Sequence, residues 1–262
     1  MNLTRYLDYI QDLKSTLTSL NCEAAIIGNF PYQKLEVDIY SFSLGRGPKN
    51  ILITSGIHGE EQAAPYALLQ FIQGHIKKYL HDYTFTIIPI INPTGFSKKT
   101  RRGSGNRDLN RYFGKEGCFP ENNIVLEFLK DKTFDHHFDM HEDIDIRHGG
   151  AYVYENGSNH GSEAKILELT REFLSWIETQ GIKINRSPVI YGARNDQGII
   201  HRPVEHQPDA KIQKLGALVP VLLTRSITKR GTTLETSMWY PFDLRVTVQV
   251  KHLNFWLSNS IG

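Results

Sequence analysis

The feature that most constrains the fold is a series of short apolar runs that alternate with segments of helical periodicity. Residues 51–54 (ILIT) and 84–91 (TFTIIPII) are almost continuously apolar, which is typical of strands buried on both faces. Between them, residues 61–80 fit a helix, with Pro65 in its first turn, where proline is tolerated. A buried strand, a helix and a second buried strand indicate a largely parallel sheet covered by helices.

The rest of the chain continues this alternation. Apolar spacing predicts a helix over 3–20, and residues 35–44 alternate as a half-exposed strand does. Further expected strands are 23–28, 134–141, 151–155, 218–224 and 231–236, and further expected helices are 121–130, 162–180 and 242–258. We therefore predict a single domain over residues 1–262. It is expected to be an α/β fold with three layers, α/β/α, around a mixed, largely parallel and twisted central sheet.

Composition argues against several classes of function. Thirty Lys and Arg against 28 Asp and Glu give a net charge of +2, so the chain lacks the basic field of a protein that binds nucleic acid or anionic lipid. The sequence has neither an apolar run of about 18 residues, which a membrane span needs, nor the apolar core of a signal peptide. Cys22 and Cys118 cannot form a disulfide framework. We expect a cytoplasmic protein without a nucleic-acid or membrane partner, and the oligomeric state stays open.

Eleven histidines are more than a near-neutral chain of 262 residues usually carries, and two of them stand in His-x-x-Glu motifs. His58 and Glu61 follow the strand at 51–54, and His160 and Glu163 stand in a similar place later in the chain. Histidine and glutamate at this spacing can bind one metal ion. A polar helix start has the same appearance, with glutamate near the positive end of the helix dipole. Spacing alone does not choose between these interpretations or between the two pairs.

Two later strand ends also carry candidate functional groups. Asp139 and His141 lie where the strand 134–141 runs out into a loop, so His141 could complete a metal site with the first pair. His136 and His137 compete with it, but adjacent strand residues point to opposite faces, so at most one shares a face with His141. Glu235 ends another apolar strand, where a carboxylate is costly unless it is paired or used in chemistry.

An arginine-rich loop is expected over residues 97–107. Arg101 and Arg102 lie in it, and Asn110 and Arg111 follow between apolar neighbours. A solvated basic loop is the commoner interpretation of such a cluster. The guanidinium group, however, is a planar fork that suits a carboxylate.

Taken together and in this order, these segments resemble the zinc carboxypeptidase family, the carboxypeptidase A-like metallopeptidases. The motifs that carry the resemblance are His58-x-x-Glu61, Asn92-Pro93-x-Gly95, Arg101 or Arg102, Asp108-x-Asn110-Arg111-x-Phe113, Asp139-x-His141 and Glu235. They span residues 58–235, and their order sets His160 and Glu163 aside because these residues follow His141. The succinylglutamate desuccinylase/aspartoacylase group is similar in its Asn-Pro and Asp-Leu-Asn-Arg motifs and in its metal triad.

The resemblance implies a role for each matched side chain. One Zn²⁺ per chain would be bound by His58, Glu61 and His141. The metal would polarise the scissile carbonyl and acidify its water. Glu235 would act as general base and then as general acid, and Arg101 would stabilise the oxyanion. Asn110 and Arg111 would hold the terminal carboxylate of the substrate, with Arg102 as a further substrate-binding candidate that spacing does not separate from Arg101.

The implied function is a zinc-dependent metallocarboxypeptidase that hydrolyses a C-terminal peptide or amide bond. Its substrate is expected to be a peptide or acyl amino acid with a free carboxylate. The first alternative is an N-acyl amino acid amidohydrolase like the desuccinylases and aspartoacylases. The second is an inactive zinc-binding module, which Glu235 and Arg101 argue against because a pure binder needs neither.

The segment before the Glu235 strand departs from the family. Many members carry a tyrosine there, whereas residues 192–234 contain none and Tyr191 lies upstream. The same segment holds Arg194 and Arg202. If one of these arginines lines the specificity pocket, acidic C-terminal side chains are expected to be preferred.

Overall fold

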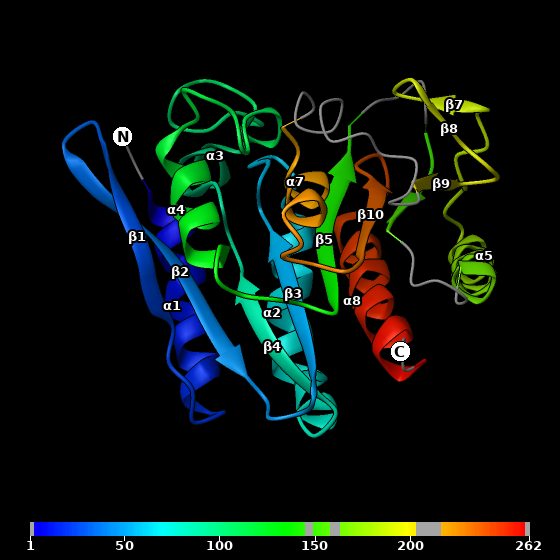
Figure 1. Ribbon diagram of the computed structural model, residues 1–262, viewed down its shortest axis with the longest axis horizontal. Coiled ribbons are helices and arrows are strands. Elements are labelled where there is room, and N and C mark those ends of the chain that lie inside the picture. The colour runs from blue at the N-terminus through cyan, green and yellow to red at the C-terminus, as the bar shows by residue number, and fades with distance from the viewer. Residues whose placement is uncertain (1–2, 145–148, 158–162, 203–215, 260–262) are drawn as a thin grey trace.

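The computed structural model describes residues 3–144, 149–157, 163–202 and 216–259 (Figure 1). In this part of the chain, eight strands form one sheet in the order β1-β2-β4-β3-β5-β10-β6-β9. The strands are β1 Ala25–Tyr32, β2 Leu35–Leu44, β3 Lys49–Ser55, β4 Tyr83–Ile88, β5 His136–Asp143, β6 Tyr152–Asn156, β9 Ile199–Arg202 and β10 Gly231–Ser237. A separate hairpin is formed by β7 Val189–Ile190 and β8 Ala193–Arg194.

The sheet is mixed, with a parallel centre. β4, β3, β5 and β10 run parallel to one another. β2 and β6 pair antiparallel to this centre on its two sides, and β1 and β9 form the edges. The predicted α/β architecture with a mixed, largely parallel sheet is confirmed.

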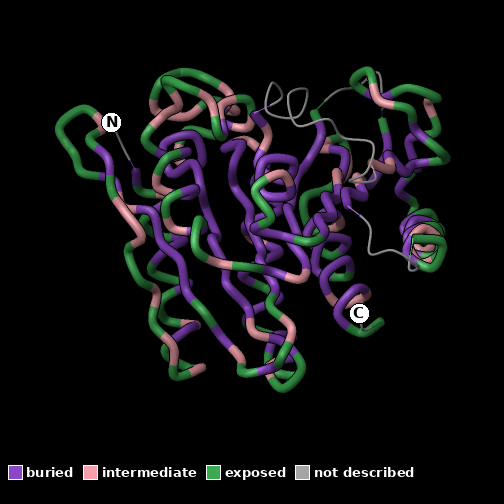
Figure 2. Tube along the Cα trace, in the orientation of Figure 1, coloured by how far each residue is buried: buried purple, intermediate pink, exposed green. Residues whose placement is uncertain are grey.

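Helices cover both faces of the sheet (Figure 1). One face packs against α1 Thr4–Thr18, α2 Ala63–Gly74, α5 Glu163–Thr179 and α8 Phe242–Ser258, and the other against α4 Pro120–Leu129 and α7 Leu218–Thr224. The shorter helices are η1 Ile76–Tyr79, α3 Pro93–Lys98 and η2 Leu109–Arg111. Figure 2 shows the central strands buried between these layers.

Alternate residues of the two central strands β5 and β10 point to opposite sides of the sheet. On the side of α2 and α8, which we call the core face, the side chains are His136, Phe138 and Met140 of β5, with Thr232 and Leu234 of β10. On the other side, which we call the pocket face, they are His137, Asp139 and His141 of β5, with Thr233 and Glu235 of β10. This division decides which of the predicted residues can meet.

One predicted element is wrong. Residues 218–224 (LVPVLLT) are the helix α7 and not a strand. Its residues are buried from Leu218 to Leu223, and a short run that is apolar all round has no periodicity to separate helix from strand. Pro220 fits the first turn, where a helix has no amide partner to lose.

Other boundaries move by a few residues. The helix expected over 61–80 is α2 followed by η1, and the strand expected at 23–28 is β1 at Ala25–Tyr32. His160 lies outside the described residues. Within the described ranges, the helices are too short or too polar to cross a membrane. A single domain and a cytoplasmic location stay predictions.

Candidate metal centre and active site

The loop that carries the first two candidate ligands is held by the Asn92-Pro93-x-Gly95 segment. His58 and Glu61 lie between β3 and α2. Asn92 caps α3 by accepting from the Gly95 amide at 2.8 Å, and its side-chain NH₂ donates to the Ile57 carbonyl at 3.0 Å. A Cβ on Gly59 would lie 1.9 Å from the Gly95 backbone, so the two segments touch only because Gly59 has no side chain. The Asn92-Pro93-x-Gly95 motif therefore shapes the ligand loop.

Three predicted ligands converge from two directions. The Nδ1 atom of His58 lies 2.5 Å from Oε1 of Glu61, and Nδ1 of His141 lies 2.8 Å from Oε2 of the same carboxylate. One ligand atom from each residue lies within 4.8 Å of the other two. All three residues are buried, with at most 3% of their surface exposed. Two imidazole nitrogens and one carboxylate aimed at one point form a group that could hold a divalent metal ion.

The far nitrogen of each imidazole contacts a second carboxylate. Nε2 of His58 lies 3.0 Å from Oδ1 of Asp108, and Nε2 of His141 lies 3.1 Å from Oδ2 of Asp139. A carboxylate behind a histidine ligand fixes the ring and places the proton on the nitrogen away from the metal. Asp108 and Asp139, which the sequence presented only as members of motifs, are thus the orienting groups.

The charges of this group stabilise one another. Burial raises the pKa of Glu61, but the two imidazoles outweigh it and hold that pKa well below its ordinary range. Burial lowers the pKa of His141, but Asp139 and Glu61 reverse this and raise it well above its ordinary value. The Glu61 carboxylate therefore stays ionised at neutral pH, as a metal ligand must be.

Glu235 lies beside His141 on the pocket face, because β10 pairs with β5 in parallel and these two residues are register partners. Burial raises the pKa of Glu235 to about 8, with the negative charges of Glu61 and Asp143 adding to the effect and His141 and Arg101 opposing it. A carboxylate with a pKa near neutrality can both take up and release a proton. Its surroundings suit the general base and acid that the resemblance implies.

The structure distinguishes Arg101 from Arg102, which the spacing of the motifs alone could not do. Arg101 lines the cavity, with Nε donating to Oδ2 of Asp108 at 3.0 Å and Nη1 to Oε1 of Glu61 at 3.4 Å. Arg102 is exposed, donates to the Asn106 carbonyl at 3.1 Å and does not line this cavity. The geometry therefore does not support Arg102 as a substrate-binding residue.

Asn110 and Arg111 line the same cavity. Oδ1 of Asn110 accepts from the Leu218 amide at 2.8 Å. This bond satisfies one amide in the first turn of α7 and leaves the side-chain NH₂ group of Asn110 as a donor. Gly216, with a φ of +63°, packs so closely that a Cβ would lie 2.2 Å from the Arg111 carbonyl oxygen. Asn110 and Arg111 are thus held against the start of α7, the element that we expected to be a strand.

The cavity holds two residues whose role was open. Arg202, at the end of β9, lines it with its guanidinium carbon 4.8 Å from the centroid of the Tyr154 ring, whereas Arg194 is exposed on the hairpin and does not. Tyr191 also lines the cavity, and its hydroxyl donates to Asp143 at 2.8 Å. The sequence did not place Tyr191 at the site because it lies far upstream of Glu235. The turn of the β7–β8 hairpin brings it to Asp143, at the end of β5.

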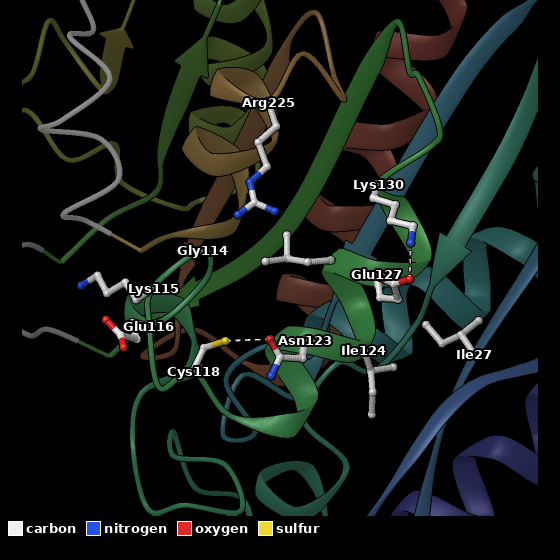
Figure 3. A pocket seen from close by; sticks show the side chains of 11 residues that line it. Ile27, Gly114, Lys115, Glu116, Cys118, Asn123, Ile124, Glu127, Lys130 and Arg225 are labelled. Atoms are coloured by element: carbon white, nitrogen blue, oxygen red, sulfur yellow. Dashed lines mark hydrogen bonds and ion pairs between the residues drawn. The ribbon is translucent and has the colours of Figure 1, made fainter.

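The cavity around these groups has a volume of about 640 Å³, a size typical of small-ligand sites. A second cavity of about 690 Å³ lies elsewhere, beside α4 (Figure 3). Its walls include Cys118, Glu127, Lys130 and Arg225, and it has no histidine among its lining residues. We therefore identify the candidate site by its chemistry and not by its size.

Comparison with known proteins supports the predicted resemblance. The family model of the succinylglutamate desuccinylase/aspartoacylase catalytic domain matches residues 48–154, a range that includes the three candidate metal ligands. No curated protein matches the chain. The resemblance to this group and to the metallocarboxypeptidases is confirmed.

Solved structures share the fold. A candidate metallopeptidase from Shewanella amazonensis is 21% identical, with a TM-score of 0.79 over 98% of this chain and 94% of that one. A metallo-carboxypeptidase from Burkholderia cenocepacia is 16% identical, with a TM-score of 0.65 over 95% and 67%. A succinylglutamate desuccinylase/aspartoacylase from Rhodobacter sphaeroides is 16% identical, with a TM-score of 0.56 over 91% and 63%. The family model and the fold support a hydrolase of the carboxypeptidase and desuccinylase/aspartoacylase class.

Proposed function

We propose that the chain is a zinc-dependent hydrolase that releases a C-terminal acidic amino acid from a peptide or amide. One observation carries the proposal: a single cavity contains the three-ligand group, the candidate base Glu235 and separate cationic side chains suited to two carboxylates. A pure metal-binding module needs only the first of these. The substrate would be bound through its carboxylates, without a nucleic-acid or membrane partner.

The residues present fit a zinc ion. His58, Glu61 and His141 would hold it through Nδ1, a carboxylate oxygen and Nδ1, the ligand types of catalytic zinc sites. The carboxylates of Asp108 and Asp139 already orient the two rings for this. When bound, the ion supplies the positive charge that polarises a scissile carbonyl and acidifies water.

The chain's own groups supply the remaining chemistry. Glu235 would accept the proton of the attacking water and pass it to the leaving amine, which its raised pKa suits. Arg101, held by Asp108 and Glu61, presents a fixed cation to negative charge that develops on the carbonyl oxygen. Asn110 and Arg111 would bind the α-carboxylate and so restrict cleavage to the last bond of the substrate.

Arg202 supports an acidic side chain at the released residue. Tyr154, whose ring contacts the Arg202 guanidinium, pairs with Thr233, two residues before Glu235. Two strand residues correspond to roughly 7 Å, about the reach of an aspartate or glutamate side chain from the scissile bond. Burial lowers the pKa of Arg202, Tyr154 opposes this, and the like charge of Arg111 adds to the lowering. Arg111 and Arg202 lie in the same cavity, and two cations beside the metal group favour a substrate with two negative groups.

A second candidate function has its own support. The matching family model describes desuccinylases and aspartoacylases, and an N-acyl amino acid could be bound by the same groups as a peptide. The two functions differ in what lies on the acyl side of the scissile bond. Substrates that share a C-terminal glutamate and differ in the acyl group separate them.

The test compares zinc-loaded protein on N-benzoyl-Gly-Glu, N-benzoyl-Gly-Gln, N-succinyl-Glu and N-acetyl-Asp, with amine release as the readout. We expect hydrolysis of the benzoyl dipeptides, faster for Glu than for Gln by a factor of about 10 to 100, because a charged hydrogen bond contributes about 1.5–3 kcal/mol. Hydrolysis of the N-acyl amino acids alone would establish the second candidate. Zinc binding without hydrolysis of any of the four would indicate a binding module.

Arg194 offers a matched control for the acidic preference. Replacing Arg202→Gln should lower kcat/KM for the Glu substrate by a factor of about 10 to 100 and leave the Gln substrate within about threefold. Arg194→Gln removes the same charge from the neighbouring hairpin and should change neither substrate. Equal losses in the two variants would attribute the preference to net charge and would contradict a direct contact.

A further inference from the structure

Beneath the candidate metal centre, a chain of buried side chains continues into the sheet. Nε2 of His141 lies 3.1 Å from Oδ2 of Asp139, and Oδ1 of Asp139 lies 2.6 Å from Oγ1 of Thr54. Oγ1 of Thr54 in turn lies 2.7 Å from Nε2 of His137. The four residues are at most 3% exposed. Neither Thr54 nor His137 has a role in the proposed site.

The strand register builds this chain. β3 and β5 are parallel neighbours, and Thr54 is the register partner of Asp139. His137, Asp139 and His141 occupy alternate positions of β5 and so share the pocket face. The threonine hydroxyl is thereby placed between the Asp139 carboxylate and the His137 ring.

The donors and acceptors allow one arrangement. The Asp139 carboxylate only accepts, so Thr54 must donate its single proton to it. The Thr54 oxygen then accepts from Nε2–H of His137. On the other side, Oδ2 of Asp139 accepts from Nε2–H of His141, which leaves Nδ1 as the ring nitrogen that faces Glu61 and that would bind an ion after losing its proton. Each hydrogen bond in this series thus determines which atom donates and which accepts in the next one.

We propose that Thr54 and His137 are positioning residues for the metal centre. They hold the Asp139 carboxylate in one orientation, and Asp139 holds the His141 ring with Nδ1 toward the ion. The inference rests on the proposed metal site. A carboxylate bound at only one oxygen can rotate, and loss of such outer contacts typically weakens metal binding by a factor of about 10 to 100.

The core face offers a matched control within the same two strands. There, Nε2 of His136 lies 2.9 Å from Oγ1 of Thr232, which also contacts Glu155. This pair has the same residue types and is similarly buried, but it leads away from the metal centre. If a buried threonine–histidine contact only stabilised the fold, removing it should change Zn²⁺ affinity to a similar extent on both faces.

The experiment measures the Zn²⁺ dissociation constant of the purified protein by competition with a chromophoric chelator, in wild type, Thr54→Val, Thr54→Ser and Thr232→Val. Thr54→Val should raise the dissociation constant by a factor of about 10 to 100. Thr54→Ser keeps the hydroxyl and should stay within about threefold of wild type. Thr232→Val should stay within about twofold, although urea unfolding of the metal-free proteins should show comparable losses of stability for the two valine variants.

Each result of the Zn²⁺ titrations either supports or overturns the positioning role of Thr54 and His137. Wild-type Zn²⁺ affinity in Thr54→Val would overturn the positioning role and leave the proposed function intact. Equal weakening in Thr54→Val and Thr232→Val would also overturn it, because a general loss of structure would then explain both. Absence of Zn²⁺ binding in the wild type would overturn the metal centre and the positioning role together. If Thr54→Val does not fold, His137→Gln provides the same comparison with Thr54 retained, and its expected weakening is again about 10- to 100-fold.

Discussion

On the core face of β5, the His136 ring stacks on Phe138 with 4.0 Å between the ring centroids, and His252 of α8 packs against Phe138 and Phe173. On the pocket face of the same strand, His141 lies between the carboxylates of Glu61 and Asp139. Burial is almost complete in both places, but the pKa of His141 is raised and those of His136 and His252 are lowered. The carboxylates of Glu61 and Asp139, and not the degree of burial, therefore distinguish His141 from the two histidines of the core face.

The carboxylates show the same division. On the core face, Glu155 binds Arg230 at 2.7 Å and accepts from Thr170 and Thr232, so its charge is neutralised inside the protein. On the pocket face, Glu235 lies among other acids, and its pKa rises to about 8. A carboxylate in the first setting is paired within the fold, whereas one in the second has the raised pKa that proton exchange with a substrate would need.

The largest expected effect is on activity, and it follows from replacing Glu235 on the pocket face. Glu235→Gln should lower kcat/KM by about 10³-fold, since general acid–base catalysis contributes about 10²–10⁴. Zn²⁺ affinity and stability at pH 7 should not fall, because glutamine keeps the size of the side chain and a carboxyl with a pKa of about 8 is mostly uncharged at that pH. The check is hydrolysis of N-benzoyl-Gly-Glu beside a zinc titration. Activity within tenfold of wild type would remove Glu235 from the chemistry.

The matching change on the core face should act on stability alone. Arg230→Met leaves the Glu155 charge buried without its partner, and we expect a loss of about 3 kcal/mol in the free energy of unfolding. Combining it with Glu155→Leu should recover much of that loss, because an apolar pair can replace a buried ion pair. Urea unfolding of the three variants measures this. Activity per folded molecule should stay unchanged, and a selective loss of activity would contradict the division.

A smaller effect concerns pH. Burial, helped by the charge of Arg230, lowers the pKa of His252 to about 3, below the value of about 6.5 in an unfolded chain. The unfolded state therefore takes up a proton first, so stability is intact above about pH 6.5 and falls by up to about 1.4 kcal/mol per pH unit down to about pH 3. His252→Phe should flatten this slope in urea unfolding between pH 7 and 4.

His81, whose side chain is 99% exposed, provides the control for the pH experiment. His81→Gln should leave the acid slope of wild type unchanged. His252→Phe should also raise stability at pH 7 by about 1 kcal/mol, because both ring nitrogens of His252 are buried without a hydrogen-bond partner among the described residues. An unchanged slope in His252→Phe would show that other groups control the acid sensitivity.

The sequence predicted the sheet well where strands have a clear signal. Runs such as 51–54 and the alternation at 35–44 correspond to β3 and β2. It was wrong at 218–224, because a helix buried all round carries no periodicity. That error concerns the site directly, since the Leu218 amide of α7 binds Asn110.

The candidate site was predictable to the extent that its residues stand in ordered motifs. His58, Glu61, His141 and Glu235 lie together as the resemblance implied. The choice of Arg101 over Arg102 depends on which side chain reaches Asp108 and Glu61, which spacing does not encode. Tyr191 and Arg202 come from a segment that could not be aligned, and only the pairing of β9 with β6 and the placing of the hairpin bring them to the cavity.

The pocket face is proposed to hold a metal ion on which hydrolysis depends. The direct measurement is to strip the protein with a chelator and titrate Zn²⁺ back while following bound metal and hydrolysis of N-benzoyl-Gly-Glu together. Activity should be lost on stripping and should return in proportion to the first equivalent of Zn²⁺, and His141→Gln should neither bind that equivalent tightly nor regain activity. Hydrolysis that persists in protein shown to be free of metal would contradict the proposed dependence on a metal ion.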